Sequence, residues 1–470
     1  MSLPNPRRAL SVAAAGTLLS LMVFTSPLAT INATALSLDA GVAGRTWILS
    51  SMSVGLAAAL LTSGTIADDA GRRRTFAAGL AVLAAGSVVA ALAGEVWVFV
   101  LARVAEGVGA AAVIAASLGI IAHAFPPGPE RAAASGVWGA SVGAGIALGP
   151  LLAAGLDRWA DWRDAYWLFA ALAALLGVAA RFLVAESRSA HRRGLDVPGA
   201  VLLAVGMSAL LAGLTEGRQG WTRPAVPALF VAAAVLLAAF AYVESRSPNA
   251  MLDLALLRHP PFAAATAAAF ATGAGAIALF SFLSGFVGIA LGVTAWGAAL
   301  LILAWSATSV VTALLARRIP ARIPGRVQLA LGLLGVGLGQ LTLTGIGPDS
   351  TWRHFLPGLL FAGVASGVVN AALGREAVAS VPPERAGLGS GANNTARYVG
   401  SAVGVTLVVV IASRPGPGTP AEDLIHGWNV AAVVTALVSV LGAAVVLACR
   451  SRRTPEPADA TVTAVVGRAG

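Results

Sequence analysis

Two long apolar runs meet at a short charged loop in residues 46–94, TWILSSMSVGLAAALLTSGTIADDAGRRRTFAAGLAVLAAGSVVAALAG. Each run, at residues 46–67 and 75–94, has about 20 residues, and a helix of that length rises far enough to cross roughly 30 Å of hydrocarbon. In lipid, a helix is the form in which such a continuous run satisfies its own backbone hydrogen bonds. The stretch therefore predicts two transmembrane helices joined by a tight loop at one membrane surface.

Similar runs recur along nearly the whole chain of 470 residues, of which 57% are hydrophobic and 11% are charged. This is too little polar surface to cover soluble domains of that length. The predicted class is an all-α polytopic membrane protein. We expect fourteen transmembrane helices, at residues 10–36, 46–67, 75–94, 97–124, 131–156, 164–184, 197–215, 225–243, 262–290, 296–316, 327–346, 354–379, 391–413 and 427–449.

The formal net charge of +10 comes from arginines alone, because the chain contains no lysine. Such a charge would suggest nucleic acid binding in a soluble protein. Here most arginines lie in alternate short loops, on the same side as both tails, which is the positive-inside pattern. We therefore expect no nucleic acid partner, and a multi-pass protein of the bacterial inner membrane with both termini in the cytoplasm.

The missing lysine also excludes a P-loop ATPase and Schiff-base chemistry in this chain. The single Cys449 rules out an intramolecular disulfide, and no metal-ligand cluster or catalytic triad spacing stands out. We expect no enzyme activity, no cofactor and no metal. An ion gradient is the remaining source of energy.

An internal repeat predicts the architecture. Pro129-Glu-Arg-Ala, followed by Ser135-Gly, recurs as Pro383-Glu-Arg-Ala, followed by Ser390-Gly, eight predicted spans later. Two parallel six-helix halves with two inserted helices give that offset. The predicted organisation is a cytoplasmic N-terminus at 1–9, an N-terminal bundle at 10–184, a linker with two inserted helices at 185–261, a C-terminal bundle at 262–449 and a disordered cytoplasmic tail at 450–470.

The loop between the first two quoted runs resembles the signature loop of the major facilitator superfamily. Its glycines permit a tight turn, while a carboxylate faces a cationic cluster. The resemblance implies the major facilitator fold and a gate latch formed by Gly64, Asp68, Gly71 and Arg72. The alternative is an ordinary charged turn.

The fourth predicted span carries Arg103 and Glu106, which share a helix face and can compensate each other inside the membrane. The pattern resembles the proton-coupling motif of facilitator antiporters, in which glutamine usually stands at the position of Glu106. Related drug:proton antiporters often carry an acid in the first span, where this chain has Pro27 near Asn32. The resemblance thus implies that Glu106 exchanges the proton, with a static ion pair as the alternative.

The fifth predicted span contains Gly145, Gly149 and Pro150, small residues that let another helix approach closely and a proline that removes one backbone hydrogen bond. This resembles the antiporter motif of exporters in the superfamily, and generic helix packing is the alternative. Candidate residues of a substrate cavity are polar or aromatic groups at membrane depth, which either face a cavity or bond a neighbouring helix. They are Asn32, Asn370, Asn393, Asn394, Arg397 and Trp305.

The resemblance covers residues 10–450 and is to the fourteen-span drug:proton antiporter branch, the multidrug efflux type linked to antibiotic resistance. It implies a proton-coupled exporter of drug-like or natural-product small molecules, powered by the proton motive force and working by alternating access. Its expected partners are the small-molecule substrate, protons and the lipid bilayer, and we expect a monomer. The alternatives are an uptake symporter for a small nutrient, or a membrane-embedded sensor. The sequence leaves open the substrate, the proton stoichiometry, the oligomeric state and whether Glu106 or another group carries the proton.

Overall fold

The computed structural model describes residues 5–189, 196–247, 254–320, 322–412, 414 and 417–449. This part of the chain is helical throughout, with short loops and no strand. The α-helices are α1 (Pro6–Thr25), α2 (Pro27–Ser37), α3 (Val42–Ala70), α4 (Arg72–Leu92), α5 (Val96–Ala124), α6 (Pro129–Trp159), α7 (Arg163–Leu183), α8 (Val197–Gly217), α9 (Ala225–Arg246), α10 (Pro260–Ala271), α11 (Ala278–Leu291), α12 (Ala295–Leu315), α13 (Gly325–Leu341), α14 (Leu356–Ala379), α15 (Ala386–Ala412) and α16 (Pro420–Ala448). The tail predicted at 450–470 and residues 1–4 lie outside the described residues.

Each of the fourteen predicted spans corresponds to a helix or to a pair of consecutive helices. Thirteen helical segments among the described residues are long and apolar enough to cross a membrane. The remaining predicted span corresponds to α13, which has 17 residues and is mostly apolar between Leu329 and Gly339. The predicted all-α polytopic class is therefore confirmed.

The first helix of each half is interrupted near its middle. In the first half, the regular helical hydrogen bonding is interrupted at Ser26, which keeps a helical conformation, and Pro27 begins α2. In the second half, a π-helical turn at Thr272–Ile277 joins α10 to α11. Such interruptions leave backbone groups without their usual helical partner, and these groups become available to other side chains.

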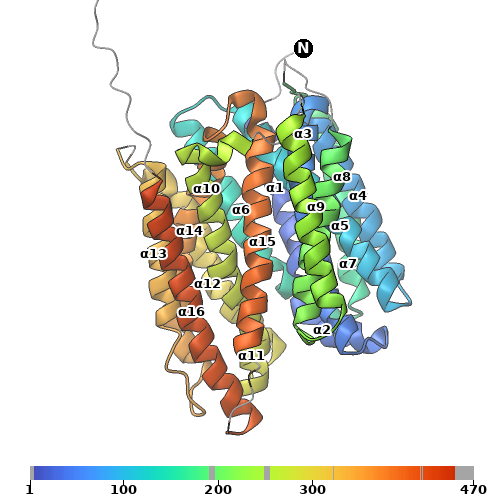
Figure 1. The fold of residues 1–470 in the computed structure, drawn as a ribbon, viewed down its shortest axis with the longest axis vertical. Helices are drawn as coiled ribbons and strands as arrows, with labels where there is room; N and C mark the ends of the chain where they lie inside the picture. Colours follow the sequence, from blue (N-terminus) through green and yellow to red (C-terminus); the bar gives the residue numbers. More distant parts are fainter. Residues whose placement is uncertain are drawn as a thin grey trace, which may run out of the picture.

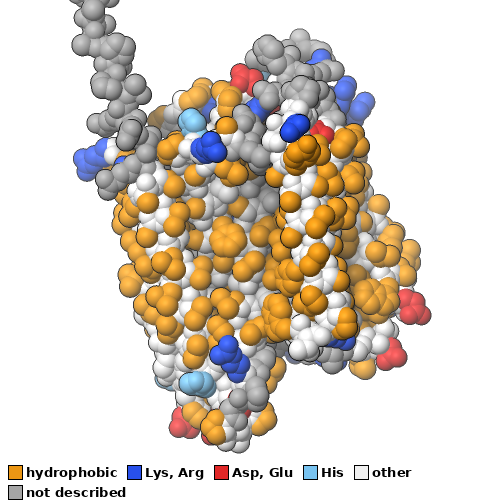
Figure 2. All heavy atoms as spheres, in the orientation of Figure 1, with side chains coloured by type: hydrophobic (Ala, Val, Ile, Leu, Met, Phe, Trp, Pro, Cys, Tyr) orange, Lys and Arg blue, Asp and Glu red, His pale blue; other side chains and the backbone are white. Residues whose placement is uncertain are grey.

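The outer surface of the bundle is apolar over its middle. Figure 2 shows hydrophobic side chains covering this band, with charged side chains gathered toward the two ends. Large apolar side chains on the helix exteriors are widely exposed, among them Leu101, Val178, Val231 and Leu441, each more than half exposed. A soluble protein would bury such groups, so the band is the surface that faces lipid.

The helices form two groups with α15 between them in the view of Figure 1. The groups meet where α15 packs on α3, and where α6 packs on α12 and α14. The helices α8 and α9 pair with each other, and α8 packs against both α3 and α15. This pair, predicted as an insertion, thus lies beside the junction of the two groups.

Candidate binding cavity and gate

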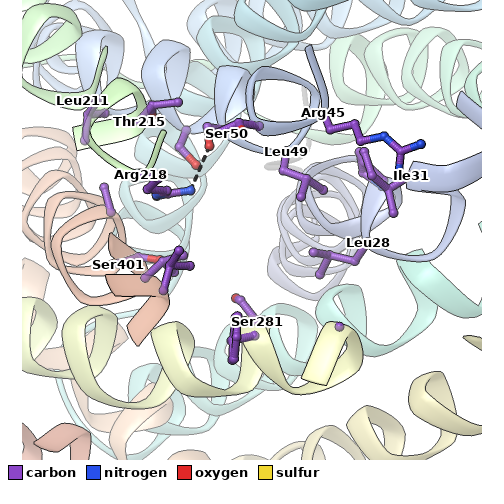
Figure 3. Close-up of a pocket in the computed structure, with 18 of the residues that line it drawn as sticks. Leu28, Ile31, Arg45, Leu49, Ser50, Leu211, Thr215, Arg218, Ser281 and Ser401 are labelled. Atoms are coloured by element: carbon purple, nitrogen blue, oxygen red, sulfur yellow. Dashed lines mark hydrogen bonds between the residues drawn. The ribbon is translucent and has the colours of Figure 1, made fainter. Parts of the chain in front are cut away.

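A cavity of about 450 Å³ lies between the two groups of helices. Its walls come from the junction of α1 and α2, from the start of α3 and the end of α8, and from the helices α11 and α15. Figure 3 shows Leu28, Ile31 and Leu49 on one side of the hollow, with Arg218, Ser281 and Ser401 across from them. Leu49 is 38% exposed, so the cavity is open at this end.

A second cavity, of about 30 Å³, adjoins the first and shares Phe24, Leu28 and Ser281 with it. Trp305 and Arg397 line this smaller space. The indole of Trp305 lies 4.5 Å from the ring of Phe280, centre to centre, and donates a hydrogen bond of 3.1 Å to Ser366 Oγ. The smaller cavity, with Trp305 and Arg397, therefore lies next to the larger one.

The opposite end of α3 is closed by the loop that was predicted to be a gate latch. Asp68 accepts hydrogen bonds from the backbone N–H groups of Gly387 at 3.0 Å and Leu388 at 2.9 Å, which belong to the first turn of α15. Arg72 donates to Asp68 at 2.9 Å and to the carbonyl of Pro383 at 3.2 Å. Both side chains are buried, and the N-terminus of a helix favours a carboxylate in this position. The latch therefore joins the first half of the chain to the second.

Glycines allow the latch to close tightly. A Cβ on Gly64 would clash with the carbonyl oxygen of Gly387, and a Cβ on Gly391 would clash with that of Leu60. Gly71, between α3 and α4, has φ of 124°, which is costly for any other residue, and its Cα borders Glu186. Backbone contact between α3 and α15 is thus possible because these positions lack side chains.

The segment that leaves α7 also packs on the latch. The backbone N–H of Ser189 donates to the carbonyl of Asp68 at 2.7 Å, and the N–H of Arg72 donates to the carbonyl of Ser187 at 2.9 Å. Glu186 accepts from the N–H of Arg73 at the start of α4. This segment begins the predicted linker to α8 and α9, so the linker and the latch are in direct contact.

Arg103 and Glu106 form an ion pair of 2.6 Å with both side chains fully buried. The other oxygen of Glu106 accepts a hydrogen bond of 2.7 Å from Ser87 on α4, and Gly86 leaves room for the carboxylate. The predicted pairing on one face of α5 is therefore present. Neither residue lines the cavities described above.

Arg103 also donates hydrogen bonds to backbone carbonyls at the interruption between α1 and α2. It donates to the carbonyls of Val23 at 2.9 Å and Phe24 at 3.2 Å. In an unbroken helix, the carbonyl of Val23 would accept from residue 27, but Pro27 has no N–H to donate. The same Phe24 lines both cavities, so the last turn of α1 separates the ion pair from the cavity.

The glycines of the fifth predicted span bring α6 against α1. A Cβ on Gly145 would lie 2.5 Å from the carbonyl oxygen of Leu18, and one on Gly149 would lie 2.5 Å from that of Met22. Pro150 cannot donate to the carbonyl of Ile146, and Thr25 approaches that carbonyl at 3.5 Å instead. The motif thus packs α6 beside the break in the first span.

The structure separates the predicted cavity residues into two sets. Trp305 and Arg397 line the smaller cavity, as described above. Asn370 accepts a hydrogen bond from Arg397, Asn393 donates to the carbonyl of Ala265, and Asn394 donates to that of Ser390. Asn32 is exposed and accepts from Arg45 at 3.2 Å. None of the four asparagines is among the residues that line the two described cavities.

Arg218 is a cavity residue that the sequence did not single out. It extends α8 by one residue and donates hydrogen bonds of 3.2 Å to Ser50 on α3 and to Thr406 on α15. Figure 3 shows its guanidinium beside Ser50 at the edge of the hollow. Burial lowers the pKa of Arg218 to about 10, so the side chain remains protonated at neutral pH.

Together these features define a multi-pass membrane protein with a cavity at the junction of two helical groups and a buried Asp68–Arg72 pair that bonds α15 across the same junction. The chain belongs to the Major Facilitator Superfamily, whose family model matches residues 10–405. It is accordingly a transporter and not an enzyme, which confirms the family and class predicted from its sequence.

Relatives and one solved structure agree with this assignment. The chain is 32% identical to the multidrug resistance protein Stp of Mycobacterium tuberculosis, over 79% of this chain and 69% of that protein. It is 30% identical to the puromycin resistance protein pur8 of Streptomyces alboniger, over 98% of this chain and 95% of that protein. The fold matches the proton:xylose symporter XylE with a TM-score of 0.68 and 15% identity, over 94% of both chains.

Proposed function

We propose that this chain is a bacterial inner-membrane exporter that moves drug-like or natural-product small molecules outward in exchange for protons. The observation that carries the proposal is a cavity between two helical groups, open at one end and closed by the Asp68–α15 latch at the other. The names of the relatives support export: besides Stp and pur8, they include a cephamycin export protein of Amycolatopsis lactamdurans. These names favour export over the alternatives of nutrient uptake and membrane sensing.

In the proposed cycle, the structure is the outward-open state. Arg45 lines the cavity near the start of α3, whereas Asp68 closes the latch near its end, roughly 35 Å away along the helix. Opening of the latch and closing of the cavity mouth would expose the same binding space to the cytoplasm. The latch and the cavity are both built within one chain, so we propose that a monomer completes the cycle.

Proton coupling is assigned to Glu106 within this proposal. Its carboxylate is close to Arg103, which bonds the carbonyls at the α1–α2 break. Movement of the last turn of α1 would connect the pair to the cavity, because that turn is the wall between them. Wetting favours the charged carboxylate and closure favours its protonated form, as exchange of a proton against substrate requires.

Transport into everted membrane vesicles tests the function. With an imposed pH gradient, acid inside, vesicles containing the chain are expected to accumulate at least one compound from a panel of natural products and amphipathic anions, and to release protons as they do so. Vesicles without the chain are the control. Accumulation that is unaffected by collapse of the gradient, or accumulation by right-side-out vesicles instead, would contradict proton-driven export.

The proposed topology has a separate test. Reporter fusions at Arg192 and in the tail after Arg453 are expected to report the cytoplasm, and a fusion near Gln219 is expected to report the periplasm. The physical reason is the concentration of arginines in the loops on the side of the termini. A cytoplasmic signal at Gln219 would contradict the fourteen-span topology.

A further inference from the structure

The two cavities carry positive charge that no protein carboxylate balances. Arg45 and Arg218 line the larger cavity and Arg397 lines the smaller one, while no Asp or Glu in the described part of the chain lines either. None of the three arginines forms an ion pair within the described residues. The partners found for them are neutral hydroxyl and amide groups.

Two other buried arginines of the chain, unlike those at the cavities, each pair with a carboxylate. Arg72 is paired with Asp68 and Arg103 with Glu106, and both pairs are buried. A buried cation is costly unless it is paired, and hydroxyl partners satisfy hydrogen bonds without neutralising the charge. The chain therefore compensates its structural arginines internally but leaves those at the cavities without a counter-charge.

Arg218 is the cation best placed to meet a ligand. It is half-buried at the cavity wall, and Ser50 and Thr406 hold its guanidinium from both sides of the junction. Arg397 is 5% exposed, and its Nε has no hydrogen-bond partner among the described residues. The guanidinium group suits carboxylates and related anions because its N–H donors form a planar fork.

The rest of the larger cavity is mainly apolar. Its wall includes Phe24, Leu28, Leu49, Leu211 and Val405. A volume of about 450 Å³ lies within the usual range for drug-sized ligands. An occupant that suits both surfaces has an anionic group on one side and an apolar body on the other.

We propose that the cavity selects amphipathic organic anions, with the carboxylate or sulfonate of the substrate bound by Arg218 and its apolar body against the α1–α2 and α11 walls. This inference names the substrate class and rests on the proposed transport function. Arg218 comes from the end of the inserted helix α8, so the insertion supplies the group that recognises charge. Arg397, on the adjoining smaller cavity, adds positive potential.

A matched pair of fluorescent probes tests the inference. The anion 8-anilinonaphthalene-1-sulfonate and the neutral N-phenyl-1-naphthylamine share the same ring system and differ by the sulfonate. Binding is measured by fluorescence titration of the purified chain in phosphatidylcholine nanodiscs, without a pH gradient. Arg218→Gln is expected to weaken binding of the sulfonate about tenfold or more and to change binding of the neutral probe less than about twofold.

Two variants control for structure and for nonspecific charge. Arg353→Gln removes the same charge from an exposed position outside both cavities, where Arg353 lies over the ring of Trp352, and is expected to leave both probes unchanged. Arg218→Lys retains the cation and is expected to retain most of the preference for the sulfonate. Equal loss of both probes in Arg218→Gln, or no loss of either, would overturn the proposal.

A further comparison separates a transported solute from a lipid headgroup. Adding phosphatidylglycerol to the nanodiscs is expected to leave the sulfonate bound to the wild type. Displacement by that lipid, absent in Arg218→Gln, would assign the cavity to lipid and overturn the inference. The binding assay needs no transport: anion binding through Arg218 without pumping of any compound of the panel in vesicles would contradict export alone, whereas pumping without any role of Arg218 in anion binding would contradict this inference alone.

Discussion

Replacing Asp68 with asparagine is expected to reduce export by at least about tenfold while the protein remains folded and inserted. The carboxylate accepts from Arg72 and from the N–H groups of Gly387 and Leu388. An asparagine keeps one acceptor oxygen and presents an amide donor in place of the other, so a donor faces a donor. Arg72 also loses its counter-charge in a buried position.

The free-energy cost of Asp68→Asn applies only to the conformation in which the latch is closed. Breaking a buried ion pair by changing one partner costs roughly 3–5 kcal/mol. In the state with the latch open, Asp68 is hydrated and the substitution costs little. A difference of that size shifts the balance between the two states by about a hundredfold or more, away from the outward-open state.

The neighbouring carboxylate provides a matched control. Asp69 is partly exposed and its carboxylate forms no hydrogen bond or ion pair with another described residue, so Asp69→Asn makes the same change of charge without affecting the latch. The conformational readout uses Leu49→Cys at the cavity mouth, in a Cys449→Ser background that removes the only native cysteine. Labelling from outside by an impermeant maleimide is expected to slow in Asp68→Asn and not in Asp69→Asn. Unchanged transport and labelling would identify the loop as an ordinary charged turn.

The fold could be predicted because lipid imposes a single simple requirement on sequence. Apolar runs of about 20 residues become helices, and all fourteen predicted runs are helical. The interruption at Ser26 was not predicted, because residues 10–36 are apolar enough to read as one span and a proline at membrane depth can lie within a single helix. In the structure, the carbonyl of Val23, which has no donor at Pro27, accepts hydrogen bonds from Arg103 and from the hydroxyl of Ser26.

The site could be predicted only where its parts are close in sequence. Arg103 and Glu106 are three residues apart on α5, so helix geometry alone brings them together. Asp68 and Arg72 are four residues apart, on either side of the turn at Gly71, so a short local turn brings them together. Arg218 meets Ser50 and Thr406 across 168 and 188 residues, and no local pattern records those contacts. In the sequence its segment marks only the end of the first inserted helix.

Asn393 shows that a polar helix face does not by itself distinguish a cavity wall from a contact with a neighbouring helix. Three polar residues within about one turn of α15 predicted a cavity wall, but a polar side chain at membrane depth is equally satisfied by a neighbouring helix. Asn393 bonds the carbonyl of Ala265 on α10, and Arg397, one turn later, lines the smaller cavity. The direction of each side chain depends on the packing partner, which the sequence of one helix does not contain.

Replacing Glu106 with glutamine is expected to abolish export against a gradient driven by pH, while substrate binding and downhill exchange remain measurable. Glutamine cannot release or accept a proton in this range, but it has the shape of the protonated glutamate. Its carbonyl can accept from Arg103 and its amide can donate to Ser87 Oγ, so both contacts of the carboxylate have a replacement. Glutamine is also the residue that the resembling motif usually carries at this position.

The competing interpretation is a static ion pair, and it predicts a different result. An unpaired Arg103 in a fully buried position would lower the melting temperature markedly and reduce binding together with transport. Arg103 retains the carbonyls of Val23 and Phe24 as acceptors, so we expect a moderate loss of stability in the glutamine variant. The melting temperature of the purified variant distinguishes these outcomes before any transport is measured.

Ser87→Ala is the matched control for Glu106→Gln, because it removes one hydrogen bond from the carboxylate and leaves its proton chemistry in place. The control is expected to lower the melting temperature slightly and to retain pH-driven export, with substrate binding that weakens as the medium becomes more acidic. In Glu106→Gln that dependence on pH is expected to disappear, because proton and substrate no longer compete through this carboxylate. A folded glutamine variant that keeps the wild-type dependence of binding on pH would show that the proton is carried elsewhere, and Asp68 is then the next buried carboxylate to test, since it is the other one that the structure ties to a conformational element.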